Sequence, residues 1–153
     1  MYRRAFLLLL VLITGIALSN AQTYHEGIAG LPAKAKFTFT RQYKESTEVS
    51  WTVIDRFIAI SFKRGNYYLE AFYNKDGKWL RTELPIEFSE LPEPVKASLN
   101  SKEFKSWHLG SSYRIYIPGK KIKYKVYIYS SNWDEMELLF DEKGVRMIDN
   151  LIY

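Results

Sequence analysis

The feature that most constrains the fold is a strand–turn–strand pattern that the chain contains twice. In residues 67–80, apolar and polar side chains alternate up to the pair Asp76-Gly77. Such alternation is typical of a strand with one buried face, and glycine accepts the positive φ of a tight turn. Residues 136–145 repeat the pattern, with Gly144 in the place of Gly77. A repeated hairpin predicts a repeated structural unit.

A short helix is predicted before each hairpin, and both helices begin at a Leu-Pro pair. Leu31-Pro32 opens the first helix, over residues 32–43, and Leu91-Pro92 opens the second. Proline is tolerated in the first helical turn because its missing N–H would have no partner there. An apolar stripe follows each pair. Its members are Ala35, Phe39 and Tyr43 in the first helix and Val95, Leu99 and Phe104 in the second.

The remaining strands are indicated by β-branched and aromatic residues in alternating order. They are expected at residues 49–55, 57–63, 79–84, 113–117 and 122–128. We therefore expect an α+β fold of two tandem repeats, each a short helix packed on a four-stranded antiparallel meander, with about eight strands together. The predicted divisions of the mature chain are a flexible leader (22–30), a first repeat (31–86) and a second repeat (87–153).

The N-terminus carries the three regions of a signal peptide, residues 1–21. Arg3 and Arg4 form a charged region, residues 6–18 are mostly apolar, and Ser19-Asn20-Ala21 supplies the small residues that a signal peptidase reads. We therefore expect cleavage after Ala21 and a periplasmic or secreted protein. The alternative is an uncleaved membrane anchor, but the apolar run is short for a bilayer span. No stable membrane anchor is expected after cleavage.

The net charge and the absence of cysteine argue against several classes of function. Loss of the two arginines of the signal peptide would lower the formal charge from +5 to +3. A charge of this size is weakly basic and gives little support for nucleic-acid binding. The chain has no cysteine, which excludes disulfides, thiol chemistry and a lipid-modified cysteine.

Catalytic and metal-binding patterns are weak. Only His25 and His108 could act as bases near neutral pH. His25 lies in the leader, and His108 has no nearby serine or aspartate in an activating pattern. The acidic residues at 134–137 and 141–142 lack the spacing of a calcium loop. We expect no enzyme activity, no cofactor and no metal.

The best candidate site is the sheet face that points away from the predicted helices. Alternation assigns to it six aromatic residues and two lysines. They are Phe57, Tyr68, Phe72, Tyr116, Tyr127, Tyr129, Lys123 and Lys125. The rings can stabilise the sheet as cross-strand pairs, or they can anchor a partner protein. Trp51 and Trp133 are not assigned to a face, because bulges near strand ends change the alternation.

The two lysines belong to a basic run, residues 120–125, with interleaved tyrosines. Such a run can bind an anionic surface or a nucleic acid. It can also be the solvated side of a strand whose lysines discourage edge pairing. The low net charge favours the second interpretation.

The motifs occur in a fixed order in both halves. In the first copy they are Leu31-Pro32, Trp51, Tyr68, Phe72 and Asp76-Gly77-Lys78-Trp79-Leu80. In the second copy they are Leu91-Pro92, Val95-Lys96, Phe140-Asp141 and Lys143-Gly144. This set resembles the PepSY-like family of exported bacterial proteins, which is also described as similar to the β-lactamase inhibitory protein. The resemblance implies an α+β fold, export and no catalytic residues, although the chain lacks the cysteines of the inhibitory protein.

These observations lead to a functional hypothesis and its alternatives. The hypothesis is an exported non-catalytic binding module that acts on another exported protein, as an inhibitor or regulator of an envelope protein, through the aromatic sheet face. The alternatives are a periplasmic protein that binds a small ligand or a glycan, and a scaffold component of the envelope. A ligand-binding protein would need a concave apolar pocket, whereas a partner protein or a glycan would use a broad aromatic face.

Overall fold

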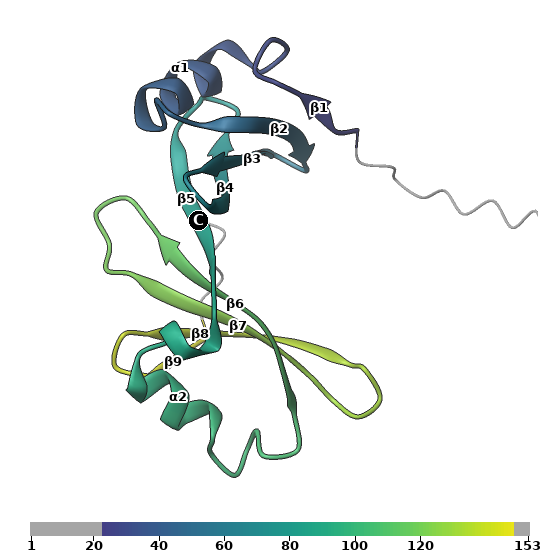
Figure 1. The fold of residues 1–153 in the computed structure, drawn as a ribbon, viewed down its shortest axis with the longest axis vertical. Coiled ribbons are helices and arrows are strands. Elements are labelled where there is room, and N and C mark those ends of the chain that lie inside the picture. Colours follow the sequence, from purple (N-terminus) through teal and green to yellow (C-terminus); the bar gives the residue numbers. More distant parts are fainter. Residues whose placement is uncertain (1–22, 149–153) are drawn as a thin grey trace, which may run out of the picture.

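The computed structural model describes residues 23–148, which form one antiparallel sheet of nine strands and two α-helices (Figure 1). The strands follow one another across the sheet in chain order. Their bounds are β1 His25–Glu26, β2 Thr47–Ile54, β3 Phe57–Arg64, β4 Tyr67–Asn74, β5 Trp79–Ile86, β6 His108–Tyr116, β7 Lys123–Tyr129, β8 Glu135–Asp141 and β9 Arg146–Met147. The helices are α1 Ala33–Gln42 and α2 Glu93–Leu99, and a 3-10 turn at Phe88–Glu90 precedes α2. The predicted signal peptide lies outside the described residues.

The first hydrophobic core lies between α1 and one face of β2, β3 and β4. A strand points successive side chains to opposite faces, so every second residue reaches the helix. The buried cluster includes Leu31, Ala35, Phe39, Tyr43, Trp51, Ile58, Ile60, Phe62, Ala71 and Tyr73. Phe37 lies off the apolar stripe of α1 and is 62% exposed. The predicted helix-facing positions of this half are confirmed, and Trp51 joins them.

The second core repeats this arrangement between α2 and β7 and β8. It includes Ile86, Leu91, Val95, Leu99, Phe104, Tyr124, Val126, Ile128, Leu138 and Phe140. Figure 1 shows α1 and α2 at opposite ends of the molecule, each against its own part of the sheet. The molecule therefore has two cores on one continuous sheet.

Strand β5 connects the two halves, and it is longer than the sequence pattern indicated. Pro85 and Ile86 extend the predicted strand and pair with β6 across Tyr113 and Ser112. Within β5, Trp79 packs against the first core, whereas Leu84 and Ile86 belong to the second. The sheet hydrogen bonds thus run without interruption from one half to the other.

The two predicted turns share one hydrogen-bond pattern. The amide of Asn74 bonds to the carbonyl of Lys78 at 3.0 Å, and the amide of Asp141 bonds to the carbonyl of Val145 at 3.1 Å. The side-chain oxygen of Asn74 accepts amide hydrogen bonds at 3.0 and 2.9 Å, and that of Asp141 accepts two at 2.9 Å. A polar side chain at the equivalent position, Asn74 or Asp141, therefore closes each turn.

Each turn glycine also touches the first turn of a helix. Gly77 has a φ of 75°, and a Cβ on it would lie 2.6 Å from the Lys34 carbonyl oxygen. Gly144 has a φ of 76°, and a Cβ there would lie 2.6 Å from the Pro94 carbonyl carbon. Glycine is needed at both positions because the backbone is left-handed and because the helix leaves no room.

The α+β class is confirmed, but the arrangement differs from the expected pair of four-stranded meanders. The strands form a single sheet, and residues 25–26, in the predicted leader, add a ninth strand that pairs with β2. Helix α2 ends at Leu99, before Phe104. The division into two repeats stays a prediction.

Candidate binding face of the sheet

The candidate site is the sheet face opposite α1 and α2, which we call the helix-free face. Cross-strand register defines its members, because directly paired residues point to the same side. On β3, β4 and β5 the residues of this face include Phe57, Ser61, Lys63, Tyr68, Glu70, Phe72, Arg81 and Glu83. On β6, β7 and β8 they include Tyr113, Ile115, Lys123, Lys125, Tyr127, Tyr129, Glu135, Glu137 and Leu139.

Tyr116 does not belong to this face, which corrects the prediction for that residue. It pairs with Thr82, whose hydroxyl lies 2.5 Å from the hydroxyl of Tyr43 at the end of α1. Tyr116 is therefore on the helix side of the sheet. Tyr113 and Ile115, also in β6, lie on the helix-free face instead. Alternation could not decide between these two sides, because β6 carries large side chains at both even and odd positions.

An ion-paired cluster occupies the centre of the helix-free face. One carboxylate oxygen of Glu83 accepts a hydrogen bond from Arg81 Nε at 2.7 Å, and the other accepts one from Lys125 Nζ. All three side chains are largely shielded from water. Buried charges are retained in proteins when they are paired in this way. The cluster connects β5 and β7 through side chains across the intervening strand β6.

The position of Lys125 corrects the prediction that the lysines of this region protect a sheet edge. Strand β7 is hydrogen-bonded to β6 on one side and to β8 on the other, so it is an interior strand. Lys125 is only 7% exposed. Lys123, which is half-buried, pairs in register with Asp141 of β8.

Aromatic rings surround the charged cluster. The Arg81 guanidinium lies 3.7 Å from the ring centroid of Phe72, a residue that is only 8% exposed. Lys125 Nζ lies 4.9 Å from the ring of Tyr113 and 5.3 Å from that of Tyr127. A cation over a ring face is attracted by the ring's electrons. These long side chains lie across the neighbouring rings, so the centre of the face is less open to water than expected.

Two tyrosines of the centre also interact with each other and with an acid. The rings of Tyr113 and Tyr127 meet edge to face, with centroids 6.1 Å apart. The Tyr127 hydroxyl donates a hydrogen bond to Glu137 at 2.9 Å. Burial and this bond to a carboxylate raise the pKa of Tyr127, so its hydroxyl stays protonated and remains a donor.

Glu70 is an acid of this face that accepts a long hydrogen bond. It is half-buried and pairs directly across the strands with Glu83. The Ser61 hydroxyl donates a hydrogen bond to it at 3.5 Å, which is the long limit for such a bond. Burial raises the pKa of Glu70, the Glu83 carboxylate raises it further, and Lys125 and Arg81 lower it.

The rim of the face at β2 to β4 is more exposed. The Tyr68 hydroxyl donates to Glu48 at 2.5 Å, and Lys63 donates to the other oxygen of Glu48 at 2.9 Å. These two hydrogen bonds lower the pKa of Glu48. Tyr68 is nevertheless 56% exposed, so its ring is accessible while its hydroxyl is fixed. Phe57, at the other end of β3, lies under the guanidinium of Arg56 at 5.4 Å.

The opposite rim carries Tyr129 and Trp133. Their ring centroids are 6.4 Å apart, and a hydrogen bond with Glu135 raises the pKa of Tyr129. Trp133 lies in the loop between β7 and β8 and is 82% exposed, with a φ of 66°. Of the eight predicted site residues, the structure thus places all except Tyr116 on one face.

Sequence reasoning missed Arg81, Glu83 and Glu70, although one signal was present. Arg81 and Glu83 are two residues apart in a predicted strand, so opposite charges on one face were foreseeable. The link from Glu83 to Lys125 depends on the pairing of β5 with β6 and of β6 with β7, and alternation within single strands does not give these pairings.

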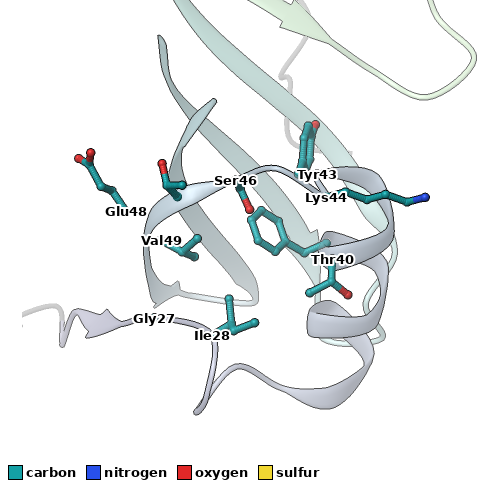
Figure 2. A pocket seen from close by; sticks show the side chains of 10 residues that line it. Gly27, Ile28, Thr40, Tyr43, Lys44, Ser46, Glu48 and Val49 are labelled. Carbon is teal, nitrogen blue, oxygen red and sulfur yellow. The ribbon is translucent and has the colours of Figure 1, made fainter. Parts of the chain in front are cut away.

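A second feature is a groove near the end of α1, with a volume of about 320 Å³ (Figure 2). It lies on the helix side, between α1, the loop into β2 and the residues after β1. Apolar side chains of Ile28, Phe39 and Val49 and hydroxyls of Thr40 and Ser46 line it. Glu48, which accepts hydrogen bonds from Tyr68 and Lys63 at the rim of the helix-free face, also lines this groove.

The candidate catalytic and metal residues are not assembled into a site within residues 23–148. The ring of His25 stacks on Trp51 at 4.2 Å, and His108 is exposed on β6. In this part of the chain no group of three or more acids or histidines could hold a metal ion. No helix among the same residues is long and apolar enough to cross a membrane.

The fold is shared with other solved structures. No family model and no curated protein matches the chain. A DUF2874 family protein from Bacteroides ovatus ATCC 8483 has a similar structure, with a TM-score of 0.68, 18% identity and coverage of 76% of this chain and 84% of that chain.

Two further solved structures have informative names. A candidate periplasmic protein from Bacteroides eggerthii DSM 20697 gives a TM-score of 0.68 at 14% identity, covering 76% of this chain and 85% of that chain. A BLIP-like protein from Bacteroides fragilis NCTC 9343 gives 0.64 at 16% identity, covering 74% and 81%. At these identities the similarity establishes a shared, BLIP-like fold.

Proposed function

We propose that the chain is an exported, non-catalytic binding module that holds another exported protein on its helix-free face. The observation that carries the proposal is the concentration of rings and charges on that face, ordered by ion pairs and hydrogen bonds. Tyr68 and Trp133 are exposed at its two rims. Large, rigid aromatic side chains supply much of the binding energy in protein interfaces. The BLIP-like name of one similar structure supports a protein as the ligand.

The finer role that we propose is inhibition or regulation of an envelope protein. The helix-free face is a broad surface in which the central side chains already contact one another. Such a preorganised surface loses little conformational entropy when a partner binds. It offers no assembled acid, base or metal among the described residues, so a bound protein would be held without a chemical change.

Export is part of the proposal. The signal-peptide pattern of residues 1–21 and the name of the Bacteroides eggerthii structure support a periplasmic or secreted location. Intact-mass measurement of the exported protein tests it, and the expected mature chain starts at Gln22. A mature chain that still starts at Met1 would contradict the proposal.

We also propose that the chain arose as two tandem repeats, residues 31–86 and 87–153, after a leader at 22–30. The support is the shared turn pattern and the contact of Gly77 and Gly144 with equivalent helix positions. In each half the contacted residue is the third after the leucine of the Leu-Pro pair. The family resemblance to PepSY-like proteins rests on the same motifs.

Comparative capture tests the binding function. The wild-type chain, a Tyr127→Ala/Tyr129→Ala variant and a Phe37→Ala control are used as baits for the envelope proteins of the producing cell. Phe37 is an exposed ring on α1, on the other side of the sheet. We expect a partner that the wild type and the control retain equally and that the double variant loses. Equal retention by a correctly folded double variant would contradict binding through these rings.

A small ligand is the second candidate, and the groove of Figure 2 is the observation that favours it. Its mixture of apolar and hydroxyl-bearing side chains suits a small amphipathic molecule. Native mass spectrometry of the protein purified from its own envelope distinguishes the two functions, since a retained small molecule would add a discrete mass.

A further inference from the structure

We infer that the outer face of α1 binds reversibly to the surface of a membrane that carries anionic phospholipids. The inference goes beyond the proposed function, because α1 lies on the side of the sheet opposite the helix-free face. Helix α1 is at one end of the molecule (Figure 1). The site consists of Lys34, Phe37, Arg41 and Lys44, which we call the α1 stripe.

Helix geometry places the α1 stripe on the side away from the first core. The buried residues of α1 define its inner side. Lys34, Phe37 and Arg41 follow one another at spacings of three and four residues, so they lie above one another on the outer side. All three are exposed, and so is Lys44, which follows the helix. Lys44 extends away from the groove at the end of α1 (Figure 2).

The cations of this region are mostly uncompensated. Residues 33–44 include four basic residues and no acid. Lys34 pairs with Asp76 at the surface, at 3.3 Å. Lys36, Arg41 and Lys44 form no salt bridge with any other residue between 23 and 148. Their charge is therefore available to an external anionic surface.

The turn between β4 and β5 extends the basic region, because it touches the first turn of α1. This turn contains Lys75 and Lys78, which are both exposed. The acids of the region are Asp76 in the same turn and Glu45 after the helix, and they offset only part of the positive charge.

The basic run at residues 120–125 differs from the α1 stripe. Lys121 is paired with Glu142, and Lys125 is paired with Glu83. The fold therefore balances much of the charge in the most basic stretch of the sequence, whereas it leaves most of the charge on α1 unbalanced.

The stability of the helix does not account for the lysines of α1. Lys34 and Lys36 lie in the first turn, where the helix dipole disfavours positive charge. That turn has no acid in α1, whereas the first turn of α2 has Glu93. Residues that oppose a local preference of the fold are expected at functional sites.

The packing of the helix does not account for the stripe either. Counted from the leucine of each Leu-Pro pair, the first three stripe positions correspond to Pro94, Ala97 and Ser101 in the second half. Helix α2 packs on its core with neither a cation nor a ring at these positions. The stripe is therefore a feature of α1 that the shared architecture does not require.

The aromatic ring in the stripe favours a lipid surface over a soluble polyanion. Phe37 is exposed between Lys34 and Arg41, and the Arg41 guanidinium lies 5.2 Å from the ring centroid. At a membrane surface, basic residues attract anionic headgroups while an aromatic side chain enters the interface. A soluble polyanion would be attracted by the cations alone.

Vesicle flotation tests the inference with the exported chain purified from the producing cell. The vesicles contain phosphatidylcholine with or without phosphatidylglycerol. We expect binding to the anionic vesicles to be about tenfold tighter or more than to the neutral ones. Binding should be lost when the salt is raised from about 0.1 M to about 1 M, because salt screens exposed charges.

Two double variants assign the binding to the α1 stripe. Arg41→Gln/Lys44→Gln should weaken binding to the anionic vesicles about tenfold or more. Lys102→Gln/Lys105→Gln removes an equal charge from exposed residues after α2, and it should bind as the wild type does. Circular dichroism shows whether each variant is folded.

Phe37→Ala distinguishes a membrane from a soluble polyanion. We expect it to weaken binding to the anionic vesicles about fivefold, because the ring no longer enters the interface. Its binding to soluble polyphosphate should equal that of the wild type. Vesicle binding that is unchanged in Phe37→Ala would overturn the membrane as the ligand and favour a polyanion.

The remaining outcomes separate this inference from the proposed function. Absence of vesicle binding, equal binding to neutral and anionic vesicles, or equal losses in the two double variants would overturn the inference. None of these results concerns the helix-free face. Loss of the captured partner in the Tyr127→Ala/Tyr129→Ala variant decides the proposed function independently.

Discussion

At the scale of single residues, the helix-free face contains a carboxylate, Glu70, whose surroundings disfavour its ionised form. Burial and Glu83 raise the pKa of Glu70. The folded chain therefore holds the Glu70 proton at a higher pH than the unfolded chain does. Between the two pKa values the folded state binds more protons, so the free energy of unfolding decreases as the pH rises through that window.

The Glu70→Gln variant should remove this pH dependence. At pH 7 we expect it to be as stable as the wild type or more stable, because an unfavourable charge is gone. The difference should shrink as the pH falls below the ordinary pKa of glutamate, where both states of the wild type are protonated. Urea unfolding at several pH values measures it. A variant that is clearly less stable at pH 7 would show that Glu70 stabilises the fold.

Substitution of Lys125, in contrast, should reduce the stability of the fold, because Lys125 is the buried partner of Glu83. Lys125→Met keeps most of the side-chain volume but leaves Glu83 with Arg81 alone. Removal of one partner from a buried pair is strongly destabilising, and we expect a loss of about 3 kcal/mol in the free energy of unfolding. Lys121→Met is the matched control, since Lys121 pairs with Glu142 at the surface and should matter little. Equal losses of stability in Lys125→Met and Lys121→Met would contradict the burial of the Lys125–Glu83 pair.

At the scale of elements, each turn glycine fixes a hairpin against a helix. Gly77→Ala and Gly144→Ala would both combine a left-handed backbone with a clash against helix backbone atoms. We expect each to cost about 3 kcal/mol or more, by thermal or urea unfolding. Gly65→Ala separates the two effects, because Gly65 has a φ of 60° but open space around it. Its cost should be only about 1 kcal/mol.

A similar loss of stability in all three glycine variants would mean that the left-handed backbone alone accounts for the cost of each substitution. That result would contradict the packing of the two turns on α1 and α2. A clearly larger loss at Gly77 and Gly144 than at Gly65 would show that both hairpins are attached to their helices in the same way, which the proposed duplication requires.

Most elements could be predicted from the sequence because their signals are local. Alternation defined the hairpin strands, and the Leu-Pro pairs marked the two helices. The face of Tyr116 and the interior, buried position of Lys125 could not be predicted in this way. They depend on the register of β5, β6 and β7, which residues far apart in the sequence determine. Strand β1 was missed because two residues carry no periodicity.

The face on which the candidate site residues lie could also be predicted for the most part from the sequence. Seven of its eight predicted residues share one face, since strand alternation places them there. Their environment was not predictable, because the burial of Phe72 under Arg81 and of Lys125 against Glu83 arises from contacts between different strands.

At the scale of the whole molecule, one sheet joins two cores. Phe39 is almost completely buried in the first core, and Phe39→Ala should cost about 3–5 kcal/mol. Because β5 pairs with both β4 and β6, we expect the loss to reduce amide protection in β7 and β8 as well as in β3 and β4. Hydrogen exchange measures it. Unchanged protection in β7 and β8 would show that the halves unfold independently.

The central claim is that the helix-free face is the surface that meets a partner protein. Site-specific photocrosslinking in the producing cell tests it most directly, with a photoreactive phenylalanine placed at Tyr68 on that face or at Phe37 on α1. Both rings are exposed to similar extents, 56% and 62%, so accessibility does not favour either position. The account predicts a discrete crosslinked protein from position 68 and none from position 37. A discrete adduct from position 37 alone would contradict it.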